Sequence, residues 1–171
     1  LHPGPGVGGH CLAVDPYFIV EKAPQQARLI ALAREINSTM PLFIIETAKK
    51  LVNHKEKAKI AVFGLAYKGN VGDVRESPAV QIKQALSEAG YIIGVFDPHV
   101  PDESITVDEA VRDADLILIL TDHDEFKSLD YSQLALKMHR PVVFDTRNIL
   151  PVGGSGTNGC RLYNLGNVAA T

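Results

Sequence analysis

From residue 59 onward, short apolar runs alternate with segments of helical periodicity, and this alternation restricts the fold more than any other feature of the sequence. Strands of this length separated by helices predict parallel pairing through right-handed crossovers. We therefore expect an α/β fold with a doubly wound parallel sheet, whose ligand lies at the carboxyl ends of the strands. The expected strands are 59–64, 91–96, 116–120 and 142–145, with 161–165 as a candidate fifth. The expected helices are 78–89, 107–112 and most of 124–137.

A long helix is expected before the sheet, over residues 25–52, because apolar side chains recur there at spacings of three and four. Pro41 lies inside this stretch, and we expect it to kink or divide the helix. The apolar stripe is longer than one small sheet can cover, so part of it should meet another surface. The polar residues 53–57 mark a boundary, which divides the chain into residues 1–56 and a sheet domain at 57–171.

The first candidate site is a loop with four glycines at positions 4, 6, 8 and 9, followed by Cys11. Glycines let the backbone approach a ligand closely, and a cysteine near a helix N-terminus is favoured as the thiolate. Cys11 is therefore the candidate nucleophile. Asp15, four residues later, could handle a water molecule or a proton during its chemistry. Since Pro16 follows, Asp15 fits equally well as the N-cap of a helix, and the two roles can coexist.

Three other interpretations of this loop are weaker. Gly4, Gly6 and Gly9 match G-x-G-x-x-G, but no strand precedes them and Pro5 interrupts them, so we do not predict a dinucleotide fingerprint. His10 and Cys11 are zinc-ligand types, yet they are adjacent and lack partners at the usual spacing, so we predict no metal site. A thiol hydrolase using the same pair is disfavoured, because adjacent side chains point apart on most backbones.

Composition excludes several classes of partner. The chain has 171 residues with 17 basic and 20 acidic side chains, a net charge of −3 and no basic tract, so we expect neither nucleic acid nor an anionic membrane as a partner. Its apolar runs are too short to span a bilayer and no signal peptide precedes the first motif, so we expect a cytoplasmic protein. The two cysteines do not suggest a disulfide framework, and Cys160 is interpreted as an incidental free thiol.

A second group of candidates follows the expected strands. Lys68 and Arg75 come after the first strand, around a helix N-terminus, which suits a phosphate-bearing ligand; each could equally be a solvated surface residue. Asp97 ends the second strand, where a dinucleotide-binding domain keeps its ribose acid, but the proline that follows favours a turn role. His123 could act as a base, although we prefer a loop role because no nucleophile is near it in sequence.

The segment P-G-P-G-V-G-G-H-C-L-A-V-D-P-Y-F at residues 3–18 resembles the catalytic-cysteine signature of the UDP-sugar 6-dehydrogenases, in the UDP-glucose/GDP-mannose dehydrogenase family. UDP-glucose dehydrogenases tend to have Ser and Lys where this chain has His10 and Val14. The resemblance is to the branch that oxidises UDP-N-acetylmannosamine or UDP-N-acetylglucosamine, and residues 24–30 resemble the N-acetylmannosamine enzymes. The sequence does not decide between the manno and gluco substrates.

This resemblance implies a four-electron oxidation of a sugar C6 alcohol to a carboxylate with two NAD+, in the service of surface polysaccharide synthesis. It implies that Cys11 carries a thioester and that Asp15 positions or deprotonates the hydrolytic water. It implies that Arg75 reaches the NAD cofactor. The positions implied to contact the UDP-sugar are His2, Gly4, Gly6, Gly8, Tyr67, Lys68 and Arg147.

The resemblance also implies that the long helix joins two domains and forms a homodimer contact. Because Leu1 is not an initiator methionine and the signature loop begins almost at once, we expect a C-terminal fragment whose NAD-binding domain lies upstream. A hypothesis from another class is that the chain as it stands is a non-catalytic UDP-sugar-binding and dimerisation module.

Overall fold

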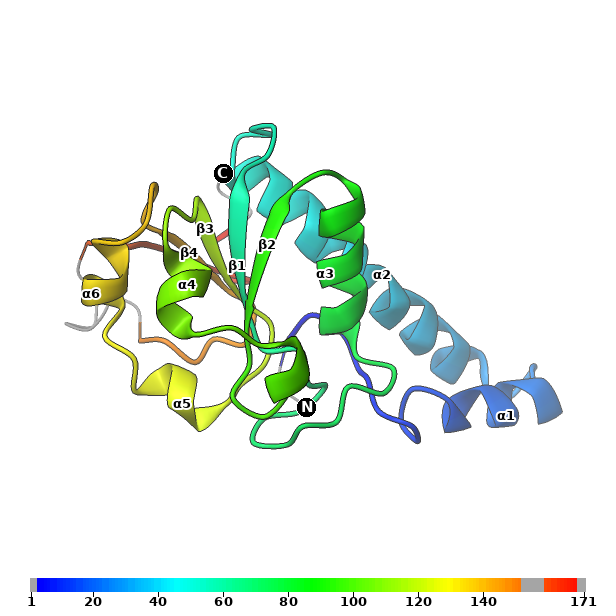
Figure 1. Ribbon diagram of the computed structural model, residues 1–171. Helices are drawn as coiled ribbons and strands as arrows, with labels where there is room; N and C mark the ends of the chain where they lie inside the picture. The colour runs from blue at the N-terminus through cyan, green and yellow to red at the C-terminus, as the bar shows by residue number, and fades with distance from the viewer. Residues whose placement is uncertain (1–2, 152–158, 169–171) are drawn as a thin grey trace.

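The computed structural model describes residues 3–151 and 159–168. Its centre is a five-stranded parallel sheet in the order β2-β1-β3-β4-β5, which confirms the predicted fold class (Figure 1). The strands are β1 (Lys59–Phe63), β2 (Ile92–Phe96), β3 (Leu116–Ile119), β4 (Val142–Asp145) and β5 (Arg161–Asn164). The helices are α1 (Asp15–Lys22), α2 (Arg28–Leu51), α3 (Pro78–Glu88), α4 (Val107–Val111), α5 (Asp124–Lys127) and α6 (Tyr131–Ala135), with a 3-10 turn at Pro101–Glu103.

Helices cover both faces of the sheet, and the alternation of side chains along β1 explains how. Ile60 and Val62 pack into a core cluster with α2 and α3, whereas Ala61 and Phe63 pack into a second cluster with α4, α5 and α6. Figure 1 shows the two layers on opposite sides of the strands. Because every strand is parallel, the carboxyl ends of all five meet at one edge.

Helix α3 begins and ends where its sequence signals predict. The Ser77 hydroxyl accepts a hydrogen bond from the Ala79 amide at 3.2 Å and donates to the Leu65 carbonyl at 2.6 Å. Pro78 occupies the first turn, and Gly90 follows the helix with a φ of +88°. This cap therefore ties the start of α3 to the segment after β1.

Of the two effects expected of Pro41, a kink or a division, the division does not occur, since one helix α2 runs through Pro41 from Arg28 to Leu51. The half after the proline is held by burial, with Ile44 and Ala48 fully buried against the sheet. The half before it extends beyond the sheet together with α1 (Figure 1), and Leu29 there is 78% exposed. Tertiary packing therefore offsets the hydrogen bond that proline removes.

Residues 124–137, which were expected to be mostly helical, contain two short helices, α5 and α6. Asp130 lies between them, and its carboxylate accepts hydrogen bonds from the amides of Ser132 at 3.0 Å and Gln133 at 3.2 Å. Because Asp130 caps a new helix, the preceding helix ends before it. The apolar periodicity of this stretch did not reveal that break. Most of the glycine-rich stretch 151–160 lies outside the described residues. No helix in the described ranges is long and apolar enough to cross a membrane.

Candidate functional site

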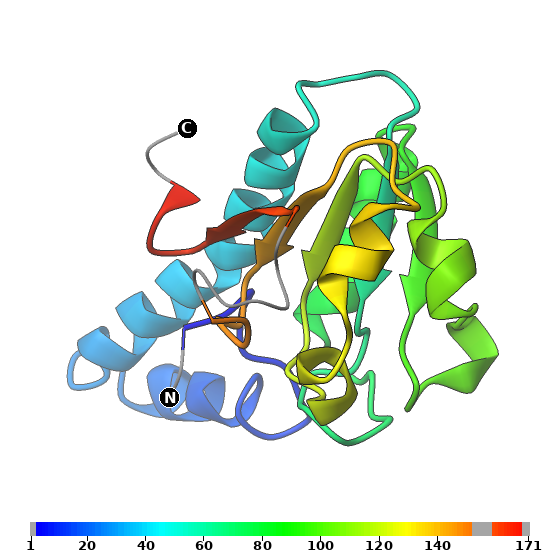
Figure 2. The same cartoon turned by 90° about the vertical axis from the view of Figure 1, so that its left-hand side faces the viewer.

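The glycine loop lies across the carboxyl edge of the sheet, beside the segments that follow β1 and β4 (Figure 2). A Cβ on Gly8 would lie 2.6 Å from the Glu76 carbonyl oxygen and 2.7 Å from Tyr67 Cβ, so only glycine fits this close approach. The Gly9 amide donates to the Arg75 carbonyl at 3.1 Å. The loop is therefore packed onto the segment after β1.

Three of the predicted substrate residues, Gly4, Tyr67 and Arg147, come together here. The Tyr67 ring covers Gly9, since a Cβ on that glycine would lie 3.0 Å from Tyr67 Cε2. Arg147 Nη1 occupies the space that a Cβ on Gly4 would need. Tyr67 and Arg147 thus reach the same loop from different strands.

Arg147 is held in place with part of its hydrogen-bonding capacity unused. Its side chain is 18% exposed, and Nη2 donates to Asp122 Oδ2 at 3.0 Å. Its buried Nε has no partner among the described residues. Burial acts to raise the pKa of Asp122, but the Arg147 guanidinium outweighs it and the pKa is lowered. A buried guanidinium N–H without a partner is a candidate donor to an anionic ligand.

A cavity of about 400 Å³ opens beside Arg147. Its lining comes from the N-terminal loop, from the segment after β4 and from the end of β5 and the residues that follow it, namely Pro3, Thr146, Arg147, Asn148, Asn164, Leu165 and Gly166. A ligand pocket at the carboxyl ends of parallel strands is typical of doubly wound folds. Lys68, the other predicted cation, differs from Arg147 in its surroundings. Its side chain is exposed, and within the described part of the chain nothing pairs with its ammonium group.

Arg75 lies on the same segment as Tyr67, but its guanidinium is paired. Nε donates to both carboxylate oxygens of Asp73 at 3.0 and 3.1 Å, and Nη2 donates to Oδ2 at 2.6 Å. This pairing lowers the pKa of Asp73 to about 2. Asp73, and to a smaller extent Tyr67 and Cys11, raise the pKa of Arg75.

Cys11 lies in an exposed turn directly before α1. Its carbonyl accepts hydrogen bonds from the amides of Val14 at 3.0 Å and Asp15 at 2.8 Å. The prediction that Asp15 is the N-cap is wrong, since Asp15 is the first helical residue and Val14, without a side-chain cap bond, precedes it. The turn around Cys11 already bends the chain into the helix, which moves the cap position back by one residue. Asp15 remains exposed, one turn from the thiol.

Asp97 has the turn role that its sequence context favoured. It is fully buried and accepts hydrogen bonds from the amides of Leu65 at 2.7 Å, Ala66 at 3.1 Å and His99 at 2.8 Å. Burial acts to raise its pKa, but hydrogen bonds from His123, Leu65 and His99 outweigh it, and the pKa falls to about 2. A carboxylate used in this way is not free to hold a ribose.

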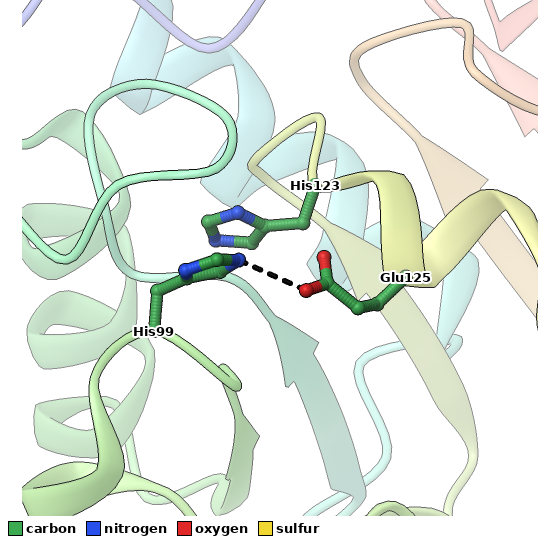
Figure 3. Close-up of side chains that lie close together, drawn as sticks. All are labelled: His99, His123 and Glu125. Atoms are coloured by element: carbon green, nitrogen blue, oxygen red, sulfur yellow. Dashed lines mark hydrogen bonds and ion pairs between the residues drawn. The ribbon is translucent and has the colours of Figure 1, made fainter.

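One group of side chains in the described residues has ligand atoms close enough to suggest a metal: His99, His123 and Glu125, within 4.8 Å of one another (Figure 3). The two imidazoles are stacked, with centroids 4.5 Å apart and planes at 26°. A nitrogen lone pair lies in its ring plane, so stacked rings do not direct their lone pairs at one ion. The geometry does not suit metal coordination.

The sequence missed one residue that positions the loop. Asn37 of α2 accepts a hydrogen bond from the Val7 amide at 3.0 Å through Oδ1, and Arg34 Nη1 donates to the same oxygen at 3.3 Å. An amide beside an apolar stripe on a helix was the available signal. Of the predicted site residues, His2 lies outside the described residues.

Two domain models of one protein family match this chain. Residues 61–152 match the UDP binding domain of the UDP-glucose/GDP-mannose dehydrogenase family, and residues 1–39 match the central domain of the same family. The chain belongs to this family. The match to the UDP binding domain thus takes in β2, β3, β4 and most of β1, and the match to the central domain takes in the glycine loop, α1 and the start of α2.

Individual relatives agree with this assignment. The UDP-N-acetyl-D-mannosamine dehydrogenase of Methanocaldococcus jannaschii is 44% identical over 97% of this chain. An NDP-N-acetyl-D-galactosaminuronic acid dehydrogenase of Ralstonia nicotianae is 40% identical over 87%. The structure of the UDP-N-acetyl-mannosamine dehydrogenase of Staphylococcus aureus matches 97% of the chain at 46% identity with a TM-score of 0.84. The chain spans 40%, 36% and 40% of the lengths of these three proteins.

Proposed function

We propose that this chain supplies the cysteine loop, the dimerisation helix and the UDP-sugar-binding domain of a UDP-N-acetyl-D-mannosamine 6-dehydrogenase. In this proposal residues 1–56 carry the loop and helix, and residues 57–171 bind the nucleotide. The observation that carries it is the packing of the glycine loop against Tyr67 and Arg147 at the carboxyl edge of the sheet. The names of the mannosamine relatives support the choice of sugar.

The pyrophosphate of the substrate is proposed to bind between Lys68 and Arg147. Both are cations with unused donors, and they follow β1 and β4, which end at the same sheet edge. A charge-assisted hydrogen bond contributes about 1.5–3 kcal/mol, so two of them would make binding measurable. The glycines at 4, 6 and 8 let the backbone come close to the sugar. His2 is proposed as a further contact to the UDP-sugar.

The proposed chemistry centres on Cys11. Its thiolate adds to the C6 aldehyde of the sugar and forms a thiohemiacetal; loss of a hydride and the hydroxyl proton leaves a thioester. Water then attacks the thioester carbonyl, Asp15 takes the water proton, and the carboxylate departs as the thiol is restored. NAD+, when bound, would accept this hydride, and a first NAD+ would accept the hydride lost earlier when the C6 alcohol becomes the aldehyde.

The sheet of this chain does not fit NAD. Its ribose-acid position, Asp97, is buried among three amides, and the turn after β1 has Tyr67 and Lys68 in place of the second close glycine. We therefore place the main NAD site in a domain outside these residues and keep Arg75 as the contact from this chain. The cytoplasmic location expected from the sequence stays a prediction.

Calorimetry on the chain tests the binding half of this proposal. We expect weak UDP binding that is lost in Lys68→Ala and in Arg147→Ala, with no measurable NAD binding. UDP binding that is indifferent to both substitutions would move the site elsewhere, and tight NAD binding would reverse the ligand assignment.

A chimera tests the catalytic half. In it, this chain replaces the matching part of the Methanocaldococcus jannaschii relative, and NADH formation is followed with UDP-N-acetylmannosamine, its gluco isomer and its galacto isomer. We expect the manno substrate to have the highest kcat/KM. Preference for the gluco isomer would make the chain a UDP-N-acetylglucosamine 6-dehydrogenase, and UDP binding without NADH from any substrate would support the non-catalytic binding module.

A further inference from the structure

His123 is fully buried beneath the segment that carries Tyr67 and Lys68. Its Nδ1 lies 2.8 Å from the Asn70 amide nitrogen, whose N–H can only donate. Its Nε2 lies 3.3 Å and 3.2 Å from the two carboxylate oxygens of Asp97, which can only accept. These two partners select the tautomer with the proton on Nε2 and the lone pair of Nδ1 directed at Asn70.

His99 and Glu125 close this arrangement from the solvent side. The His99 ring stacks on His123, and its Nε2 lies 3.1 Å from Glu125 Oε1 (Figure 3). Phe126 packs edge-on against the His123 ring, with centroids 5.1 Å apart. The rings of His99 and Phe126 therefore hold the His123 ring from two directions, so its two hydrogen bonds have a single geometry.

The segment around His123 makes further contacts with the turn at residues 67–70. Asn70, with a φ of +60°, donates from Nδ2 to Asp124 Oδ2 at 2.7 Å and accepts from the Asp124 amide at 3.0 Å. A Cβ on Gly69 would lie 2.6 Å from the Asp122 carbonyl oxygen, and Asp122 is also the partner of Arg147. Residues 122–124 therefore contact both parts of the proposed pyrophosphate site, namely the turn that carries Lys68 and the side chain of Arg147.

We propose that His123 is a positioning residue of the UDP-sugar site, which holds the turn at 67–70 through its Nδ1 lone pair so that Lys68 faces the ligand. The inference rests on the proposed function, because it takes Lys68 as a substrate contact. The hydrogen bond to Asp97 serves the other half of the arrangement: it keeps the proton on Nε2 and the acceptor on the side of Asn70.

Two isosteric substitutions separate this role from general stability. In His123→Asn the amide oxygen can replace Nδ1 as acceptor for Asn70, whereas in His123→Gln the amide nitrogen can replace Nε2 as donor to Asp97. Both remove the imidazole and its stacking on His99, so both should lower the melting temperature. His139→Asn, at an exposed histidine that contacts Asp115 at 2.7 Å near the opposite end of the sheet, is the matched control.

The binding measurement is calorimetry of UDP on the full chain. We expect His123→Asn to keep the wild-type Kd within about twofold and His123→Gln to weaken it about tenfold, the effect of losing one hydrogen bond to a positioned group. His139→Asn should leave the Kd unchanged. Equal Kd values in the Asn and Gln variants would overturn the positioning role.

A second measurement needs no ligand, and its wild-type part needs no variant. Nitrogen NMR of the wild-type imidazole should show His123 protonated on Nε2 only, and amide exchange at Asn70 should be slow in wild type and in His123→Asn but fast in His123→Gln. A proton on Nδ1, or fast exchange in the wild type, would overturn the inference even if neither variant folds. If the wild-type chain binds no UDP, the proposed function fails and with it the binding role, while exchange at Asn70 reports whether His123 still holds the turn.

Discussion

Arg147 donates from Nη2 to Asp122 Oδ2 across 3.0 Å, and this ion pair joins the segment after β4 to the segment after β3. The pair orients the guanidinium so that Nη1 lies against Gly4 while the buried Nε has no partner in the described residues. An ion pair that orients an arginine without saturating it suits an anion site, because the remaining donors are fixed before the ligand arrives.

Arg147→Lys should therefore weaken UDP binding by about tenfold or more, since an ammonium cannot contact Asp122 and an anion with a fork of donors. The measurement is calorimetry with UDP. Arg112→Lys, at an exposed arginine after α4, is the control and should leave the Kd unchanged. Full UDP affinity in Arg147→Lys would contradict the assignment of Arg147 to the ligand.

Gly8→Ala should displace the glycine loop, because its Cβ would lie 2.6 Å from the Glu76 carbonyl oxygen and backbone at this place cannot yield cheaply. We expect weaker UDP-N-acetylmannosamine binding with circular dichroism of the sheet unchanged. Wild-type affinity for the sugar nucleotide would show that the loop does not need this close contact to bind it.

Cys11→Ala in the chimera should abolish formation of the carboxylate, because no thioester can form, while the Kd for UDP stays within about twofold. Cys160→Ala is a matched control, since that thiol is half-buried and lies 3.4 Å from the Tyr131 carbonyl oxygen rather than near the loop. Uronate production by Cys11→Ala at the wild-type rate would exclude Cys11 as the nucleophile.

Asp97 should make the free energy of unfolding of the domain depend on pH in the acidic range. Its folded pKa is about 2, below the ordinary value of about 3.9 in unfolded chains, so the folded state holds the charged form more strongly. The stabilisation is complete above about pH 5 and is lost as pH falls through the folded pKa of about 2, with a magnitude of roughly 2–3 kcal/mol.

In Asp97→Asn, we therefore expect a lower free energy of unfolding at pH 6 and a flatter decline between pH 4 and 2 in urea titrations. Comparing the two proteins isolates Asp97 from Asp145, whose pKa burial raises and whose contribution has the opposite sign. Parallel pH profiles for the two proteins would show that another carboxyl group causes the decline.

The exposed apolar half of α2 is predicted to form a dimer. Leu29 is 78% and Leu32 51% exposed on α2, and Phe18 of α1 is 60% exposed. Light scattering at micromolar concentration should give the mass of a dimer, and Leu29→Glu should give a monomer. Leu136→Glu, at an equally exposed leucine after α6, is the control and should remain dimeric. A monomeric wild type with α2 folded would contradict the prediction.

Local patterns in the sequence determined most of the fold. The alternation of strands and helices predicted the parallel sheet, and Ser77 with Pro78 and Gly90 predicted both ends of α3, because these signals act over a few residues. The glycine loop was likewise a candidate from the sequence alone, and the structure packs it against Tyr67 and Arg147 at the carboxyl edge of the sheet. Where a local signal was outweighed, as for the division expected at Pro41 and the N-cap expected at Asp15, packing or a neighbouring turn decided the outcome.

Only the tertiary structure decided the contacts between distant segments. Asn37 meets Val7, Asp122 meets Arg147, and His123 meets the Asn70 amide because parallel strands bring their carboxyl ends to one edge. Which side chains meet there depends on strand order and register, and no periodicity within one segment encodes either. The sequence by itself therefore determined which residues we propose for the chemistry, while burial and long-range hydrogen bonds decided which residues hold them in place.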